Sequence, residues 1–79
     1  MMTPAQCRAA RGLLDWPQKH LADAARVGVV TVRQFENSAA DPRRATLDAL
    51  QRALESAGVE FIAENGGGAG VRLKARAPR

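Results

Sequence analysis

The fold of this 79-residue chain is decided by the stretch QKHLADAARVGVVTVRQFEN, residues 18–37. It contains two short apolar patterns with helical spacing, and each pattern leaves polar side chains on its other side. The apolar positions are Leu21, Ala22 and Ala25 in the first pattern and Val32 and Phe35 in the second. Gly28 separates the two patterns, because glycine is a weak helix former. The stretch therefore predicts two short helices, the second from about Val29 to Asn37.

The residues before this stretch predict a further helix over about 4–14. Thr3 is a suitable N-cap, the proline after it suits the first helical turn, and Gln6 can close a capping box with Thr3. Asp15 and Pro17 then form a second start signal, with Pro17 in the first turn of the next helix. The N-terminal half of the chain is thus expected to consist of three short helices.

The residues after the stretch predict a fourth helix and a β-hairpin. Asp41 is a suitable N-cap for a helix over about 42–57, whose apolar residues recur at helical spacing. A glycine-rich loop over 64–70 separates two short runs of strand-forming residues, 59–63 and 71–74. The expected fold class is therefore mainly α, with four helices and a C-terminal β-hairpin.

Length and composition are those of one small globular protein. The chain is 46% hydrophobic, which favours folding of most of it. A single cysteine and a single histidine cannot supply a disulfide framework or a zinc-ligand set, and no apolar run reaches the roughly 18 residues of a membrane span. We expect a soluble cytoplasmic protein with no metal, cofactor or membrane contact. Its expected parts are a helical domain at 1–58, a hairpin at 59–74 and a basic tail at 75–79.

The net charge of +4 originates at the C-terminal end of the chain. Residues 1–70 contain eight Lys and Arg and eight Asp and Glu, so this part is formally neutral. The excess positive charge is carried by Arg72, Lys74, Arg76 and Arg79. Composition alone therefore indicates a basic end and not a basic body. This end is either a solubilising tail or an arm that contacts phosphates.

Residues 11–38 resemble the helix-turn-helix of the Xre family, the lambda-repressor and Cro-like DNA-binding domains. The matching positions are Gln18, Leu21, Ala22, Ala25, Val27, Thr31, Val32, Phe35 and Glu36, followed by Thr46, Leu47 and Leu54 in the next helix. The resemblance extends over about residues 4–58 without a gap. It implies a lambda-repressor-like bundle in which the second helix of the motif, the recognition helix, lies in the DNA major groove.

The resemblance also implies roles for individual side chains. The residues that would contact DNA are Gln18, Gly28, Val29, Val30, Thr31, Arg33, Gln34, Asn37, Arg43 and Arg44. Arg33 would pair with guanine or phosphate, Gln34 would bond adenine, and the two valines would pack on a thymine methyl. Arg11 and Glu36 would form a structural ion pair that ties the first helix to the end of the recognition helix.

Two positions depart from the family pattern. Arg26 replaces the turn glycine, so either it adopts a left-handed conformation, at roughly 1–2 kcal/mol, or the turn is rebuilt around Gly28. Pro17 replaces the usual Ser or Thr, so either Gln18 bonds a phosphate or Asp15 caps the helix and Gln18 completes a capping box. Both alternatives leave the expected fold unchanged.

The resemblance implies a transcriptional regulator that represses or activates transcription, and we expect it to bind a palindromic operator as a homodimer. The hairpin is the expected dimer element, through Val59, Phe61, Val71 and Leu73, and the exposed side of the fourth helix is the alternative. The competing function is a protein-interaction module, such as an antitoxin or antagonist that docks a partner through the hairpin. A regulatory protein partner also fits a chain with no ligand domain. An enzyme is not expected, because the sequence has no nucleophile–base set, metal cluster or phosphate loop.

Overall fold

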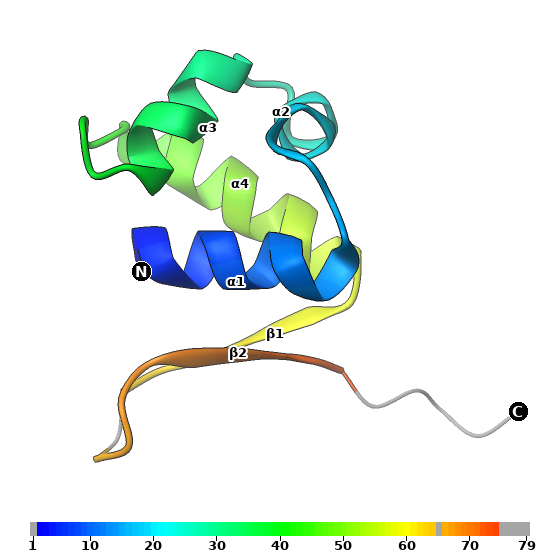
Figure 1. Ribbon diagram of the computed structural model, residues 1–79, viewed down its shortest axis with the longest axis vertical. Helices are drawn as coiled ribbons and strands as arrows, with labels where there is room; N and C mark the ends of the chain where they lie inside the picture. The colour runs from blue at the N-terminus through cyan, green and yellow to red at the C-terminus, as the bar shows by residue number, and fades with distance from the viewer. Residues whose placement is uncertain (1, 65, 75–79) are drawn as a thin grey trace, which may run out of the picture.

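The computed structural model describes residues 2–64 and 66–74. Its elements are α1 (Pro4–Leu14), α2 (Gln18–Ala25), α3 (Val29–Glu36), α4 (Arg44–Ser56), β1 (Val59–Ile62) and β2 (Gly70–Leu73). Figure 1 shows α1 in the middle of the molecule, with α3 on one side of it and the β-hairpin on the other. The expected mainly helical chain with a C-terminal hairpin is confirmed. The basic tail at 75–79 lies outside the described residues.

The start of α1 is fixed by the capping box that the sequence predicts. The Gln6 main-chain N–H donates to Thr3 Oγ1 at 3.1 Å, and the Thr3 N–H donates to Gln6 Oε1 at 2.9 Å. The Gln6 side chain then connects this helix end to the hairpin, because its Nε2 donates to the main-chain oxygens of Ile62 and Gly70 at 3.3 and 3.0 Å. Gln6 is accordingly one of the few buried polar residues, with 7% of its surface exposed.

The start of α4 differs from the sequence prediction. The helix begins at Arg44, and Arg43 occupies the N-cap position with an extended backbone and no side-chain cap. The Leu47 N–H donates to the Arg43 carbonyl at 3.0 Å, so the first helical turn closes on Arg43. The expected N-cap at Asp41 is therefore wrong. Asp41 and the proline after it belong to the loop that enters the helix.

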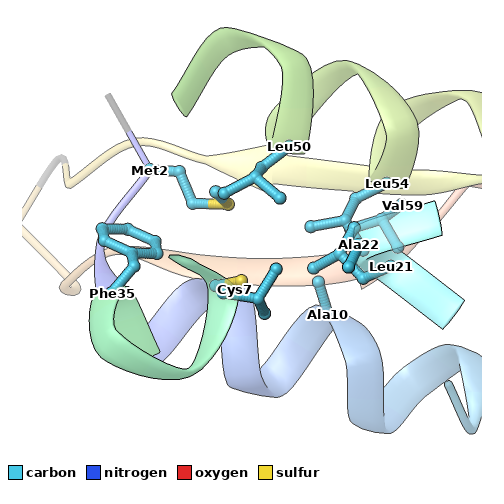
Figure 2. Close-up of a cluster of buried hydrophobic side chains, with 10 residues drawn as sticks. Met2, Cys7, Ala10, Leu21, Ala22, Phe35, Leu50, Leu54 and Val59 are labelled. Carbon is cyan, nitrogen blue, oxygen red and sulfur yellow. The ribbon is translucent and has the colours of Figure 1, made fainter. Parts of the chain in front are cut away.

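The hydrophobic core lies where the four helices and the hairpin meet (Figure 2). Its buried members are Met2, Cys7, Ala10, Leu21, Ala22, Val32, Phe35, Leu50, Leu54 and Val59. The apolar stripes predicted for the two helices of residues 18–37 point into this core, with Ala25 at its margin. Small alanines on α1 and α2 allow the helices to approach closely, which suits a domain near the lower size limit for a single core.

The hairpin belongs to the same core as the helices. β1 and β2 are antiparallel, with Val59 opposite Leu73 and Phe61 opposite Val71. Because side chains alternate across a strand, these four share the face that packs on the helices. Val59 is fully buried within its own domain, so its side chain can support pairing of two copies only by holding the hairpin in place. Only Leu73 of this set is largely exposed, at 50%.

Candidate nucleic-acid interface

The exposed side of α3 carries one continuous stripe of side chains. Val30, Arg33, Gln34 and Asn37 are all exposed and are spaced i, i+3, i+4 and i+7, the spacing of one helix face. Asn37 is the C-cap residue, so α3 ends one residue earlier than expected. The stripe displays three hydrogen-bonding side chains and one apolar side chain on a single short helix. This is a surface that can contact polar and apolar groups at neighbouring positions of a partner.

The other residues that the resemblance assigned to DNA occupy different environments. Gly28 is exposed at the N-cap of α3 and has an ordinary extended backbone. Val29 and Thr31 are half-buried, and Val29 packs against the core. Arg43 and Arg44 are exposed at the start of α4. The structure thus brings the stripe together on α3 and leaves Val29 with a mainly structural contact.

The turn between α2 and α3 is formed by Arg26 in a left-handed conformation. Arg26 has φ 60° and ψ 43°, whereas Gly28 has φ −72° and ψ 145°. The first of the two sequence alternatives for this turn is therefore confirmed. The Val27 N–H donates to the Ala22 carbonyl at 2.9 Å, closing α2 in the manner of a Schellman motif. The half-buried Val27 side chain, directly after this turn, packs against the core.

The far end of α3 is held by an ion pair that the family resemblance implied. Arg11 Nε lies 2.6 Å from Glu36 Oε2, and Arg11 Nη2 donates to Glu36 Oε1, also at 2.6 Å. This two-bond arrangement fixes the orientation of both groups as well as their distance. The Glu36 side chain is only 1% exposed. It therefore faces the interior, although its helix displays polar residues to solvent.

Further donors surround the same residue. Gln18 Nε2 donates to Glu36 Oε1 at 3.1 Å, and Cys7 Sγ donates to Glu36 Oε2 at 3.2 Å. Arg8 Nη1 donates to the main-chain oxygen of Glu36. We call Glu36 and its four partners Cys7, Arg8, Arg11 and Gln18 the Glu36 cluster. The cluster ties the C-terminal end of α3 to α1 and to the first turn of α2.

The electrostatics of the Glu36 cluster follow from burial and hydrogen bonding. Burial by itself raises the pKa of the Glu36 carboxyl, but the hydrogen bonds from Arg11, Gln18 and Cys7 outweigh it and hold this pKa below its usual range. The bond to Glu36 raises the pKa of Arg11. Burial, followed by the bond to Glu36, raises the pKa of the Cys7 thiol. The carboxylate is therefore charged and the thiol protonated at neutral pH.

Gln18 makes a contact with Glu36 that neither sequence alternative includes. The N-cap of α2 is Pro17, without a side-chain cap, and Asp15 instead ends α1 in a left-handed conformation with φ 55°. The alternative in which Asp15 caps α2 is therefore wrong. Gln18 is half-buried and uses one amide hydrogen on Glu36. Any contact of Gln18 with a phosphate must use its second amide hydrogen.

Sequence reasoning missed two members of the Glu36 cluster. Cys7 is fully buried, as a small apolar residue would be, but its thiol also donates to the carboxylate. Arg8 received no role at all. Their positions, four and three residues before Arg11 on α1, were the available signal, because such residues lie beside one another on a helix.

Comparison with models of protein families and with curated proteins gave no match. Among residues 2–64 and 66–74, no helix has the length and apolar character needed to cross a membrane.

Proposed function

We propose that this protein is a DNA-binding transcriptional regulator with a lambda-repressor-like fold, not an enzyme, and that it acts in the cytoplasm. The observation that supports the proposal most is the exposed stripe of α3 formed by Val30, Arg33, Gln34 and Asn37. A single exposed α-helix fits the major groove, where base edges present donors, acceptors and the thymine methyl group. Arginine and amide side chains are the residues that bond to purine edges there.

The Glu36 cluster supports the same proposal, because base recognition requires a helix held in a fixed position. A carboxylate near DNA is unfavourable when it faces the phosphates. Glu36 avoids this, since it is buried and paired with Arg11. In the proposed complex Arg43 and Arg44 contact the phosphate backbone, and so does the second amide hydrogen of Gln18. These contacts position the protein, while the α3 stripe selects the sequence.

We further propose that the regulator acts as a homodimer on a palindromic operator. One α3 covers only half of a typical site, and a single module of this size buries little surface on DNA. Two copies would place their recognition helices in half-sites one helical turn apart, at about 34 Å. The hairpin lies on the side of α1 away from α3, so dimerisation through it leaves the α3 stripe uncovered (Figure 1).

The test is selection of bound DNA from a random pool, followed by fluorescence anisotropy with the selected sequence. We expect a palindrome, and an affinity that falls on the order of a hundredfold between 50 and 200 mM salt if about four phosphates are neutralised. Arg33→Ala and Gln34→Ala should each weaken binding by about 5- to 150-fold, the value of a good base contact. Arg52→Ala is the matched control, because it removes an exposed arginine from α4.

Two results would contradict the proposed function as a transcriptional regulator. One is the absence of binding to any selected sequence, and the other is binding that does not respond to salt.

The second candidate function, a protein-interaction module, is favoured by one observation. Leu73 exposes half of its surface beside the outer edge of a two-stranded sheet, where a partner segment can add a strand.

A further inference from the structure

The apolar member of the α3 stripe is unusual for its position. Val30 is 49% exposed, although it lies in the first turn of α3 among polar residues. The neighbouring Val29 packs against the core, so Val30 is the valine that faces outward. Gly28, two positions earlier, has no side chain that covers it. The two valines therefore have separate roles, which the sequence alone did not distinguish.

Neither packing nor helix formation accounts for an outward valine here. β-Branched residues are less favourable in helices than long polar side chains, because the preceding turn restricts their rotamers. Single exposed apolar residues are common on protein surfaces and need no special explanation. Val30, however, shares its helix face with Arg33 and Gln34, whose side chains are of types that bond to base edges. Its surroundings therefore point to a contact made together with theirs.

The major groove contains one apolar group that such a side chain can contact. Among the four bases, only thymine presents a methyl group to this groove, at ring position 5. Val30 and Gln34 are four residues apart on α3, which corresponds to about 6 Å along the helix axis. Base pairs follow one another at about 3.4 Å along the DNA axis, so two side chains about 6 Å apart on a helix in the groove contact bases within about two base-pair steps of each other.

We propose that Val30 determines specificity for a thymine in each operator half-site by packing on its 5-methyl group. That thymine lies within about two base pairs of the base read by Gln34. This inference rests on the proposed DNA-binding function and deepens it, because it names one base and its spacing. Val29, which is half-buried and packs against the core, is not part of this contact.

The test compares the selected operator with copies in which one thymine at a time is replaced by uracil. Uracil lacks the 5-methyl group and pairs identically, so the exchange removes only the methyl contact. We expect one thymine per half-site at which the exchange weakens wild-type binding about fourfold, the effect of exposing one methyl-sized apolar group. Val30→Ala should bind the thymine operator more weakly and should not distinguish uracil from thymine at that position.

Leu13→Ala is the matched control, since Leu13 is 41% exposed on α1, outside the α3 stripe. It should retain the full uracil effect. The inference fails if the wild type binds DNA but no thymine shows an effect, or if Val30→Ala shows the same effect as the wild type. In both cases the protein still binds DNA, so the proposed function as a regulator remains supported. If the wild type binds no DNA, the proposed function fails as well, so the two failures are distinguishable.

Discussion

At the scale of single residues, Glu36 determines how α3 is held. A carboxylate with 1% exposure is tolerated only because Arg11, Gln18 and Cys7 satisfy its oxygens. Breaking such a buried pair by removing one partner typically costs ~3–5 kcal/mol. Small domains have only ~5–15 kcal/mol of total stability. The interaction that orients the proposed recognition helix is therefore also one on which folding depends.

The depressed pKa of Glu36 predicts an acid-sensitive fold. A carboxyl whose pKa is lower in the folded state stabilises the protein at pH values above its unfolded value of 4.5. This contribution is lost as the pH falls through the lower folded pKa. Urea unfolding should therefore show wild-type stability decreasing below about pH 4.5. Glu36→Gln should be less stable at pH 7 but should lack this part of the decrease.

Glu60→Gln is the control for this pH dependence. The pKa of Glu60 is also lowered, through its hydrogen bond with Arg72, but the pair is exposed to solvent. Exposed pairs contribute little to stability. Glu60→Gln should therefore lose stability in acid nearly as the wild type does. Equal acid sensitivity of Glu36→Gln and the wild type would rule out Glu36 as the cause.

Cys7 should behave as a reporter of unfolding and not as a reactive thiol. Its side chain is fully buried, and burial raises its pKa, so both access and thiolate content are low. Its reaction with a thiol reagent at pH 8 should be at least about a thousandfold slower in the folded protein than in urea, if opening requires ~5 kcal/mol. A second thiol introduced as Ser56→Cys, at an exposed position, should react immediately. Rapid labelling of Cys7 would show that α1 opens locally.

At the scale of the element, the α2–α3 turn is strained by its own sequence. Arg26 has φ 60°, a conformation that costs a non-glycine residue roughly 1–2 kcal/mol. Arg26→Gly should therefore stabilise the protein by about 1 kcal/mol and raise its Tm by about 4–8 °C. The same exchange at Arg52, inside α4, should destabilise by about 1 kcal/mol, because glycine is a poor helix former. Thermal unfolding of both variants tests whether Arg26 strains the turn. A lower Tm for Arg26→Gly than for the wild type would contradict this inference.

Local signals explain which elements were predictable from the sequence. Thr3 and Gln6 form a complete capping box, so the start of α1 was placed correctly. Asp41 has the same chemistry as a cap, but the first turn of α4 closes on Arg43, and cap chemistry alone does not determine where a turn closes. The partial burial of Val29 depends on packing between elements, which helical spacing cannot specify. Patterns along the chain thus predicted where the helices and strands lie. They were less informative about how deeply each side chain is buried.

The same limit applies to the candidate site. The exposure of Arg33, Gln34 and Asn37 followed from helical spacing, and the structure places them as expected. The Glu36 cluster joins three separate helices, so only the family resemblance indicated the part of it formed by Arg11. The contact between Glu36 and Cys7 has no counterpart in the residues quoted for that resemblance and required the structure.

At the scale of the whole molecule, the ladder of the hairpin limits the register in which two copies could pair through β2. The Lys74 N–H donates to the Gly58 carbonyl at 2.7 Å, so residues 58 and 74 form a hydrogen-bonded pair. Such pairs alternate along an antiparallel ladder, and the outward main-chain groups of β2 are therefore those of Val71 and Leu73. A two-fold axis at Arg72 would place Val71 of one copy opposite Leu73 of the other. The outward N–H and C=O groups of Val71 and Leu73 in both copies would then be hydrogen-bonded to each other.

This register predicts a specific crosslink in a homodimer. With the axis at Arg72, the two residues at this position are directly opposite, with Cα atoms about 4.5 Å apart, within disulfide range. Arg72→Cys should therefore form a covalent dimer under mild oxidation, observed on a non-reducing gel, while the buried Cys7 stays reduced. Glu60→Cys is the control, because it lies on the same face of the hairpin but three strand spacings, about 14 Å, from its counterpart. Equally poor crosslinking of both variants would exclude pairing through β2, and the exposed side of α4 would become the dimer surface to test.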